Sequence, residues 1–130
     1  PTEKKVRYIQ SLLRCGFNTI DFGSFVSPKA IPQMADTAEV LSKLDLSTTK
    51  SKLLAIVANT RGAQDASVHP EIDYLGYPFS ISENFQMRNT HKTIAESVEI
   101  LSEWRSLGCG DCRGVDRKVI GNGCENSFFI

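Results

Sequence analysis

Long apolar runs and an excess of charge of either sign are both missing from this 130-residue sequence. The longest clean apolar run covers residues 53–58, whereas a membrane-spanning helix needs about 20 residues. Fifteen Lys and Arg residues balance fifteen Asp and Glu residues, which argues against a basic nucleic-acid surface or a polybasic membrane patch. No charged-then-apolar targeting segment opens the sequence. We therefore expect a cytoplasmic protein with neither a nucleic-acid nor a membrane partner.

Cysteine is scarce, and its four positions, Cys15, Cys109, Cys112 and Cys124, are unevenly spaced. This spacing argues against a disulfide framework and favours reduced thiols. Cys109 and Cys112 form a CxxC pair, to which Cys124 could add a third soft metal ligand. A tetrahedral zinc site needs a fourth ligand, and neither histidine is near in sequence. A redox CxxC would follow a strand in a thioredoxin-like unit, which the sequence does not show, so we expect the pair to have no metal or redox function. A small CxxC metal-binding module remains the non-catalytic alternative.

Short runs of β-branched and aromatic residues alternate with stretches in which apolar residues recur at helical spacing. This alternation is typical of βαβ units and predicts an α/β fold with a parallel sheet. The run over residues 52–59 is almost continuously apolar, which predicts a strand buried on both faces. The expected elements are a helix over residues 1–15, a strand over 18–26, a helix over 36–44, a strand over 52–59, a short helix over 60–68, a strand over 71–80, a helix over 93–104 and a strand over 118–120.

Local signals predict where several of these helices begin or end. Gly16 follows the first helix and is suited to a left-handed stop. Asp36 with Glu39 resembles a capping box at the start of the second helix, and Thr93 with Glu96 forms a full one. After residue 107 the sequence becomes glycine-dense and loses its clear period. We therefore expect a boundary there, between residues 1–106 and a divergent tail over 107–130.

Small polar residues stand near the carboxyl ends of the predicted strands, where parallel α/β folds bind ligands. In the first strand, Ile20 and Phe22 share one face and are expected to pack against helices, while Asp21 and Gly23 share the other. A buried carboxylate is costly without a cation or a donor. Asp21 is therefore a candidate site residue, and a plain hydrogen bond to a neighbouring strand is the structural alternative.

One stretch resembles the hydroxymethylglutaryl-CoA lyases. It reads DFGSFVSPK over residues 21–29, followed by IPQM over 31–34 and by Asp36. Three further segments are similar to the same family in the same order: residues 2–5, Asn59 with Arg61 and Gly62, and residues 82–97. Together they extend over residues 1–103 without large gaps.

The resemblance implies a partial TIM (β/α)8 barrel, from helix 1 through helix 4, with parallel strands 2–4 and a worn fifth strand in the tail. A whole barrel needs about 250 residues, so the chain is identified as an N-terminal half-barrel fragment of the lyase. The family cleaves 3-hydroxy-3-methylglutaryl-CoA to acetyl-CoA and acetoacetate with Mg²⁺ or Mn²⁺, in leucine catabolism and ketone-body formation. This stretch lacks the family's metal ligands, so we expect it to bind no metal and to be inactive alone.

The resemblance also assigns roles to five residues. Asp21 matches a supporting acid that orients the catalytic arginine and the metal-bound water, and Ser24 matches a serine that lines the substrate pocket. Arg88, Asn89 and Thr93 match positions that contact the CoA portion of an acyl-CoA substrate. A homodimer is compatible with the full-length family enzyme. The alternative within the same barrel is a Claisen-type synthase, similar to the isopropylmalate and homocitrate synthases.

Overall fold

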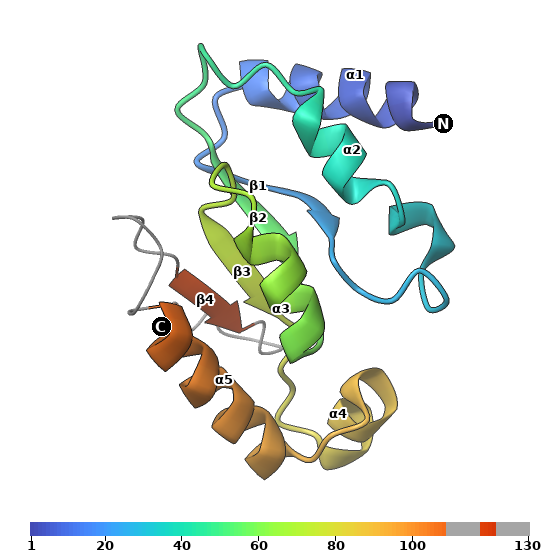
Figure 1. Ribbon diagram of the computed structural model, residues 1–130, viewed down its shortest axis with the longest axis vertical. Coiled ribbons are helices and arrows are strands. Elements are labelled where there is room, and N and C mark those ends of the chain that lie inside the picture. Colours follow the sequence, from blue (N-terminus) through green and yellow to red (C-terminus); the bar gives the residue numbers. More distant parts are fainter. Residues whose placement is uncertain (109–117, 122–130) are drawn as a thin grey trace.

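The computed structural model describes residues 1–108 and 118–121 (Figure 1). Cys109, Cys112 and Cys124 lie outside the described residues. In none of the described helices is there a segment both long and apolar enough to cross a membrane. The elements are α1 (Thr2–Arg14), β1 (Thr19–Ser24), the 3-10 helix η1 (Pro32–Met34), α2 (Thr37–Ser42), β2 (Lys52–Ile56), α3 (Thr60–Ser67), β3 (Tyr74–Tyr77), α4 (Glu83–Thr90), α5 (Ile94–Gly108) and β4 (Lys118–Gly121).

The four strands form one sheet in the order β1-β2-β3-β4, and each neighbouring pair is parallel. Chain order and spatial order therefore coincide, as the alternation of strands and helices predicts. The strand expected over residues 118–120 is present as β4, beside β3. The strand expected over 71–80 is shorter, and it ends at Tyr77 because Pro78 follows.

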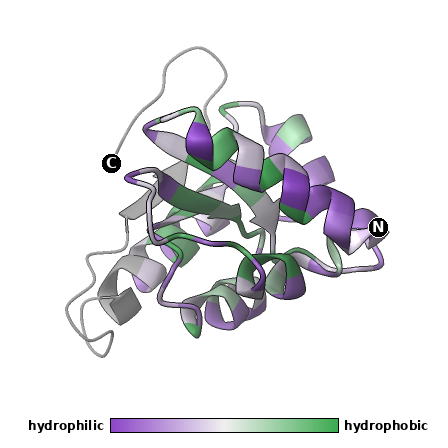
Figure 2. Ribbon diagram, turned by 90° about the horizontal axis from the view of Figure 1, so that it is seen from above, coloured by the Kyte–Doolittle hydropathy of each residue, from purple (hydrophilic) through white to green (hydrophobic). Residues whose placement is uncertain are grey.

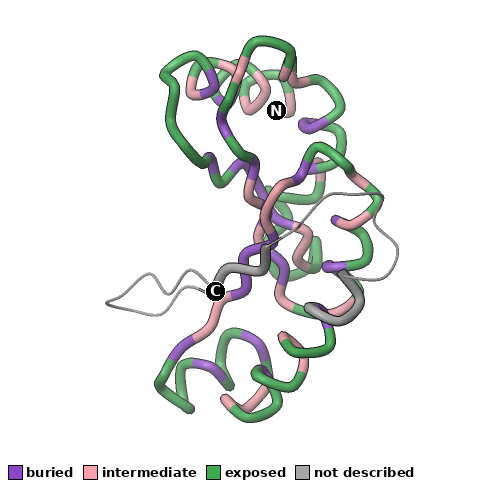
Figure 3. Tube along the Cα trace, turned by 90° about the vertical axis from the view of Figure 1, so that its left-hand side faces the viewer, coloured by how far each residue is buried: buried purple, intermediate pink, exposed green. Residues whose placement is uncertain are grey.

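The core lies between one face of the sheet and the helices α1, α2, α3 and α5. Figure 2 shows hydrophobic residues along the central strands and hydrophilic ones on α1, while Figure 3 shows burial concentrated on the strands. In and just after β2, burial alternates: Leu53, Ala55 and Val57 are almost fully buried, whereas Leu54 and Ile56 are half-buried. The expectation of full burial on both faces is therefore wrong for the described residues. The core residues are Ile9, Leu13, Ile20, Phe22, Val40, Leu41, Leu53, Ala55, Val57, Ala63, Ala66, Ile72, Leu75, Tyr77 and Trp104.

Two of the three predicted helix-end signals are confirmed. Gly16 adopts a left-handed φ of 76° after α1. The Thr93 backbone N–H donates to the Glu96 carboxylate at 2.7 Å, and the Glu96 N–H donates to Thr93 Oγ1 at 3.1 Å, which completes the capping box before α5. The box expected from Asp36 does not form, because that residue precedes α2 but its side chain makes no capping bond. Helix α4 was not expected from the sequence.

Candidate functional site

A β-bulge shapes the end of β1. The register between β1 and β2 shifts between Asp21 and Gly23, so that Phe22 is the extra residue. Because paired residues of adjacent strands share a face, Asp21 and Ser24 lie on the face of the half-buried β2 residues, while Gly23 faces α2. A Cβ at Gly23 would lie 2.8 Å from Thr37 Cγ2 of α2. The expectation that Asp21 and Gly23 share a face is therefore wrong. The paired positions are Asp21–Leu54, Gly23–Ala55 and Ser24–Ile56.

Asp21 lies opposite the helix-packed side of β1, where Ile20 and Phe22 are buried. The residue as a whole keeps access to solvent. Partial burial of its carboxyl group nevertheless raises the pKa of Asp21 above the usual value, and the backbone N–H of Gly23 offsets part of that rise. The group is therefore a carboxyl that gains from a cationic or hydrogen-bonding partner.

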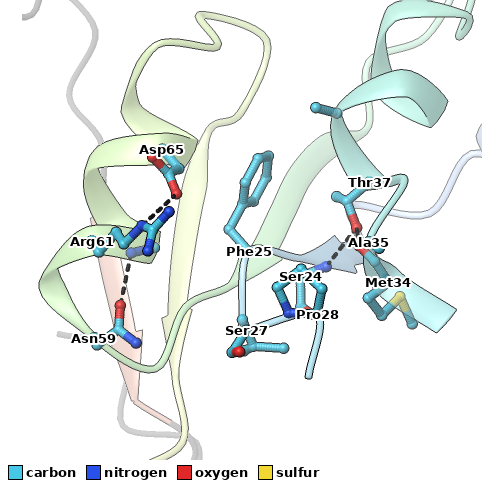
Figure 4. Close-up of a pocket in the computed structure, with 13 residues that line it drawn as sticks. Ser24, Phe25, Ser27, Pro28, Met34, Ala35, Thr37, Asn59, Arg61 and Asp65 are labelled. Carbon is cyan, nitrogen blue, oxygen red and sulfur yellow. Dashed lines mark hydrogen bonds and ion pairs between the residues drawn. The ribbon is translucent and has the colours of Figure 1, made fainter. Parts of the chain in front are cut away.

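Ser24 presents a buried hydroxyl that has no hydrogen-bond partner among the described residues. Only 7% of Ser24 is exposed. Its backbone N–H donates to Thr37 Oγ1 at 3.4 Å, and that hydroxyl in turn donates to Met34 O at 2.8 Å. Ser24 lines a cavity of about 310 Å³ between the loop that follows β1 and the first turn of α3 (Figure 4). Buried hydroxyls are normally paired, so this one is available to a ligand.

The first turn of α3 forms the opposite wall of the cavity. The Asn59 side chain caps this helix, accepting from the Gly62 N–H at 2.8 Å. A Cβ at Gly62 would lie 2.3 Å from Phe25 O, so only glycine allows the loop to approach so closely. Arg61 and Asp65 line the rim, 3.9 Å apart, and both are exposed (Figure 4). The wall therefore combines a helix amino terminus with one cation and one anion.

The other end of the same loop is fastened to α1. Lys5 Nζ donates to Gln33 O and to the Asp36 carboxylate, and Thr2 Oγ1 donates to the second Asp36 oxygen at 2.7 Å. These bonds, led by the one from Lys5, lower the pKa of Asp36 below its usual value. The Asp36 side chain thus joins α1 to the loop instead of capping α2, and this contact is what the capping-box pattern failed to anticipate.

The three residues matched to CoA contacts lie apart from this cavity. Arg88 and Asn89 are exposed on α4, and Asn89 Nδ2 donates to Phe85 O at 3.0 Å. Thr93 precedes α5 and is occupied by its capping box with Glu96. None of these three lines the cavity at Ser24. The structure therefore places Asp21 and Ser24 on one sheet face, although Asp21 does not line the cavity, and places the other three on a separate part of the chain.

A metal centre does not form among the described residues. No three His, Cys, Asp or Glu side chains come together in that part of the chain. His69 packs against the Phe25 ring with 5.5 Å between ring centroids, and His91 ends α4 with a left-handed φ of 55°. Asp21 is a single carboxyl group, which by itself is too small a donor set for a divalent cation.

Two residues of structural weight escaped the sequence reasoning. Thr37 holds the backbone of Ser24, and Gln86 is fully buried in α4. No periodic or motif signal marks either residue. Thr37 acts on Ser24, 13 residues earlier in the chain, and Gln86 lies in a helix that the sequence did not predict.

Comparison with known proteins gives one consistent result. No protein-family model matches the chain. The mitochondrial hydroxymethylglutaryl-CoA lyase of Arabidopsis thaliana is 35% identical over 98 residues, which are 75% of this chain and 20% of that protein. The lyase YngG of Bacillus subtilis is 33% identical over 102 residues, 78% of this chain and 33% of that protein.

Solved structures agree with the sequence comparison. An HMG-CoA lyase of Brucella melitensis matches with a TM-score of 0.82 and 32% identity, over 95% of this chain and 41% of that one. An HMG-CoA lyase of Acinetobacter baumannii, solved with coenzyme A and 3-methylmalate, matches with a TM-score of 0.78 and 30% identity, over 95% of this chain and 37% of that one. The chain thus spans roughly a fifth to two-fifths of the length of these relatives. Sequence and fold together show that the chain is a homologue of the hydroxymethylglutaryl-CoA lyases across part of their barrel.

Proposed function

We propose that this chain forms one side of a lyase site that cleaves 3-hydroxy-3-methylglutaryl-CoA to acetyl-CoA and acetoacetate, within a larger barrel. The observation that carries the proposal is the unpartnered, buried hydroxyl of Ser24, which lines a cavity and lies on the same sheet face as Asp21. A hydroxyl in that state can exchange hydrogen bonds with a substrate oxygen at little cost, because it gives up no protein partner.

The two residues have different roles in this proposal. Ser24 binds and orients the substrate within the cavity. Asp21 acts as a supporting acid that orients a cationic side chain or a bound water. The partial burial that raises the pKa of Asp21 makes such a partner favourable, because a neighbouring cation stabilises the ionised carboxylate. Asp21 is therefore a positioning residue in the reaction, whereas Ser24 touches the substrate.

The CoA portion is proposed to lie over α4 and the start of α5. The Arg88 guanidinium group is exposed and suits a phosphate. Asn89 and Thr93 add an amide and a hydroxyl nearby in sequence. The Acinetobacter baumannii relative was solved with coenzyme A, which supports an acyl-CoA as the ligand class. A cytoplasmic location stays a prediction, since relatives are named both mitochondrial and cytoplasmic. A homodimer of the full-length enzyme also stays a prediction.

Hydroxymethylglutaryl-CoA lyases in general depend on a divalent cation, and Mg²⁺ or Mn²⁺ is the proposed one. The described residues do not fit such an ion, because they bring together no cluster of ligating side chains. The cation would therefore need ligands beyond the described residues. The contribution proposed for Asp21 is confined to orientation of a neighbouring group.

A segment exchange tests the proposal. Residues 1–103 of this chain replace the matching stretch of the Bacillus subtilis lyase, and acetoacetate release is measured with Mg²⁺ or Mn²⁺. We expect the chimera to cleave 3-hydroxy-3-methylglutaryl-CoA at a carbon–carbon bond and to lose about ten- to a hundredfold in turnover with Asp21→Ala. Asp21→Glu should retain most of the turnover. Glu99→Ala, which removes an exposed carboxylate on α5, is the matched control and should change nothing.

Two results would count against the proposal. The first is a chimera that folds, as judged by circular dichroism, but releases no acetoacetate. The second is condensation of acetyl-CoA with a 2-oxo acid in place of cleavage, which would favour the synthase alternative. Full turnover of the Asp21→Ala chimera would leave Asp21 as a structural residue only.

A further inference from the structure

Helix α4 contributes no side chain to the hydrophobic core. Its two buried residues, Gln86 and Thr90, are both polar. The large apolar side chains of the helix face outward instead, with Phe85 54% and Met87 43% exposed. The burial that normally fixes a short amphipathic helix is therefore absent in α4, and polar contacts must hold it in place.

Those polar contacts converge on the amide of Gln86, which is fully buried. The amide oxygen accepts one hydrogen bond, and three hydroxyl oxygens lie within hydrogen-bond distance of the amide nitrogen, so both polar atoms of this amide have protein partners. The network joins the end of β3, the loop after it, α4 and the first turns of α5. Ser80 N–H donates to Gln86 Oε1 at 2.7 Å, and the two N–H groups on Nε2 face Ser97 Oγ at 2.9 Å and Thr90 Oγ1 at 3.1 Å, with Tyr77 OH a longer, shared contact at 3.4 Å.

The partners of Gln86 are themselves fixed. Tyr77 O–H donates to Ser97 Oγ at 3.0 Å, and Ser97 Oγ–H donates to Thr93 O at 2.8 Å. The Tyr77 ring packs edge-on against Trp104, with 5.5 Å between ring centroids. A buried network of this kind has a defined geometry, because every displacement leaves a polar group unpaired in a site without solvent.

We propose that Gln86 is a positioning residue that fixes α4, and with it Arg88 and Asn89, relative to β3 and α5. The inference rests on the proposed function, in which those two exposed residues bind the CoA portion. Gln86 itself is buried and touches no ligand. Its amide determines where the exposed face of α4 is presented, so it acts on substrate affinity through orientation of the helix.

The test uses Gln86→Met, which removes the amide but keeps the length and the helix propensity of the side chain. Gln64→Met makes the same change at an exposed position of α3 and is the matched control. Hydrogen exchange of the 130-residue chain should show α4 amides exchanging about tenfold faster in Gln86→Met. The substitution leaves the buried Ser80 N–H without its acceptor, which costs free energy in the docked state of α4. Amides of β2 should be unchanged.

A second measurement connects the docking of α4 to the site. In the Bacillus subtilis chimera, Gln86→Met should raise KM for the thioester about five- to tenfold and change kcat less than twofold, since the reacting atoms lie elsewhere. A residue that only stabilised the fold would lower the unfolding midpoint and leave KM unchanged. If Gln86→Met does not fold, Thr90→Val removes the contact of Thr90 Oγ1 with Gln86 Nε2, together with its bond to Gln86 O, and should give a smaller change in the same direction.

The outcomes separate the inference from the proposed function. Unchanged exchange of the α4 amides overturns the docking role of Gln86. Faster exchange with an unchanged KM overturns the connection to substrate binding. A folded, unsubstituted chimera that releases no acetoacetate from 3-hydroxy-3-methylglutaryl-CoA overturns the proposed function, and the exchange measurement alone then decides whether Gln86 docks α4.

Discussion

Replacing Ser24 with alanine should make this chain more stable, although such a substitution ordinarily removes a favourable group. The Ser24 hydroxyl is buried and has no partner among the described residues, so folding removes it from water without compensation. Alanine keeps the Cβ and leaves the backbone N–H of Ser24 free to donate to Thr37 as before. The substitution therefore removes a cost and breaks no observed hydrogen bond.

The magnitude follows from the balance of two terms. Burial of an unpaired hydroxyl costs about 1–3 kcal/mol. Loss of the packing contacts of one oxygen atom offsets a fraction of that gain, because each atomic contact is worth only about 0.1–0.2 kcal/mol. We expect a net increase of about 1 kcal/mol in the free energy of unfolding, or a rise of about 4 °C in Tm for a chain of this size.

Urea denaturation provides the assay, with Trp104 as the reporter. It is the single tryptophan of the sequence, is 5% exposed, and donates from Nε1 to Thr60 Oγ1 at 3.2 Å. The matched control is Ser51→Ala, since the buried Ser51 hydroxyl does have a partner, Phe17 O. That control should lose about 1 kcal/mol.

The reasoning fails if Ser24→Ala destabilises the chain as much as Ser51→Ala does, because the hydroxyl would then be paired in the folded state. In the Bacillus subtilis chimera the same Ser24→Ala change should raise KM for the thioester. Greater stability together with weaker substrate binding is the signature of a polar group retained for a ligand.

Four further outcomes are expected. The purified 130-residue chain should release no acetoacetate above a buffer blank, with or without Mg²⁺, and measurable release would refute the half-site interpretation. The pKa of Asp36 is lowered in the folded state, so its contribution to stability is present above the unfolded pKa and is lost as pH falls through the folded pKa. Asp36→Asn should therefore reduce the loss of unfolding free energy between pH 6 and pH 2, as measured by urea titrations. The raised pKa of Asp21 has the opposite sign, so Asp21→Asn should increase stability at pH 7 but not at pH 2, and equal effects at both would contradict partial burial. Gly62→Ala should destabilise the chain by about 1–3 kcal/mol despite the higher helix propensity of alanine, because the new Cβ meets Phe25 O, and a thermal melt with an unchanged or raised midpoint would argue against that contact.

The sequence by itself determined the order of the elements and several of their ends. Hydrophobic periodicity separates helices from strands, and alternation of the two requires parallel pairing, so β1, β2 and β3 could be placed side by side in advance. Gly16, Pro78 and the box of Thr93 with Glu96 act within a few residues of themselves. Signals of that kind are local, and they survive folding because no distant partner competes for the same groups.

The tertiary structure decided which side chains meet. The bulge after Asp21 turns Ser24 onto the same face, and no sequence pattern marks it, because the extra residue is accommodated by packing of Gly23 against α2. The Asp36 side chain could have capped α2 locally, but it binds Lys5, 31 residues away. A hydrogen bond between two charged groups of different elements outweighs the bond of a helix cap to a neutral N–H. Helix α4 escaped prediction because Gln86 docks it through hydrogen bonds, whereas periodicity detects only apolar burial.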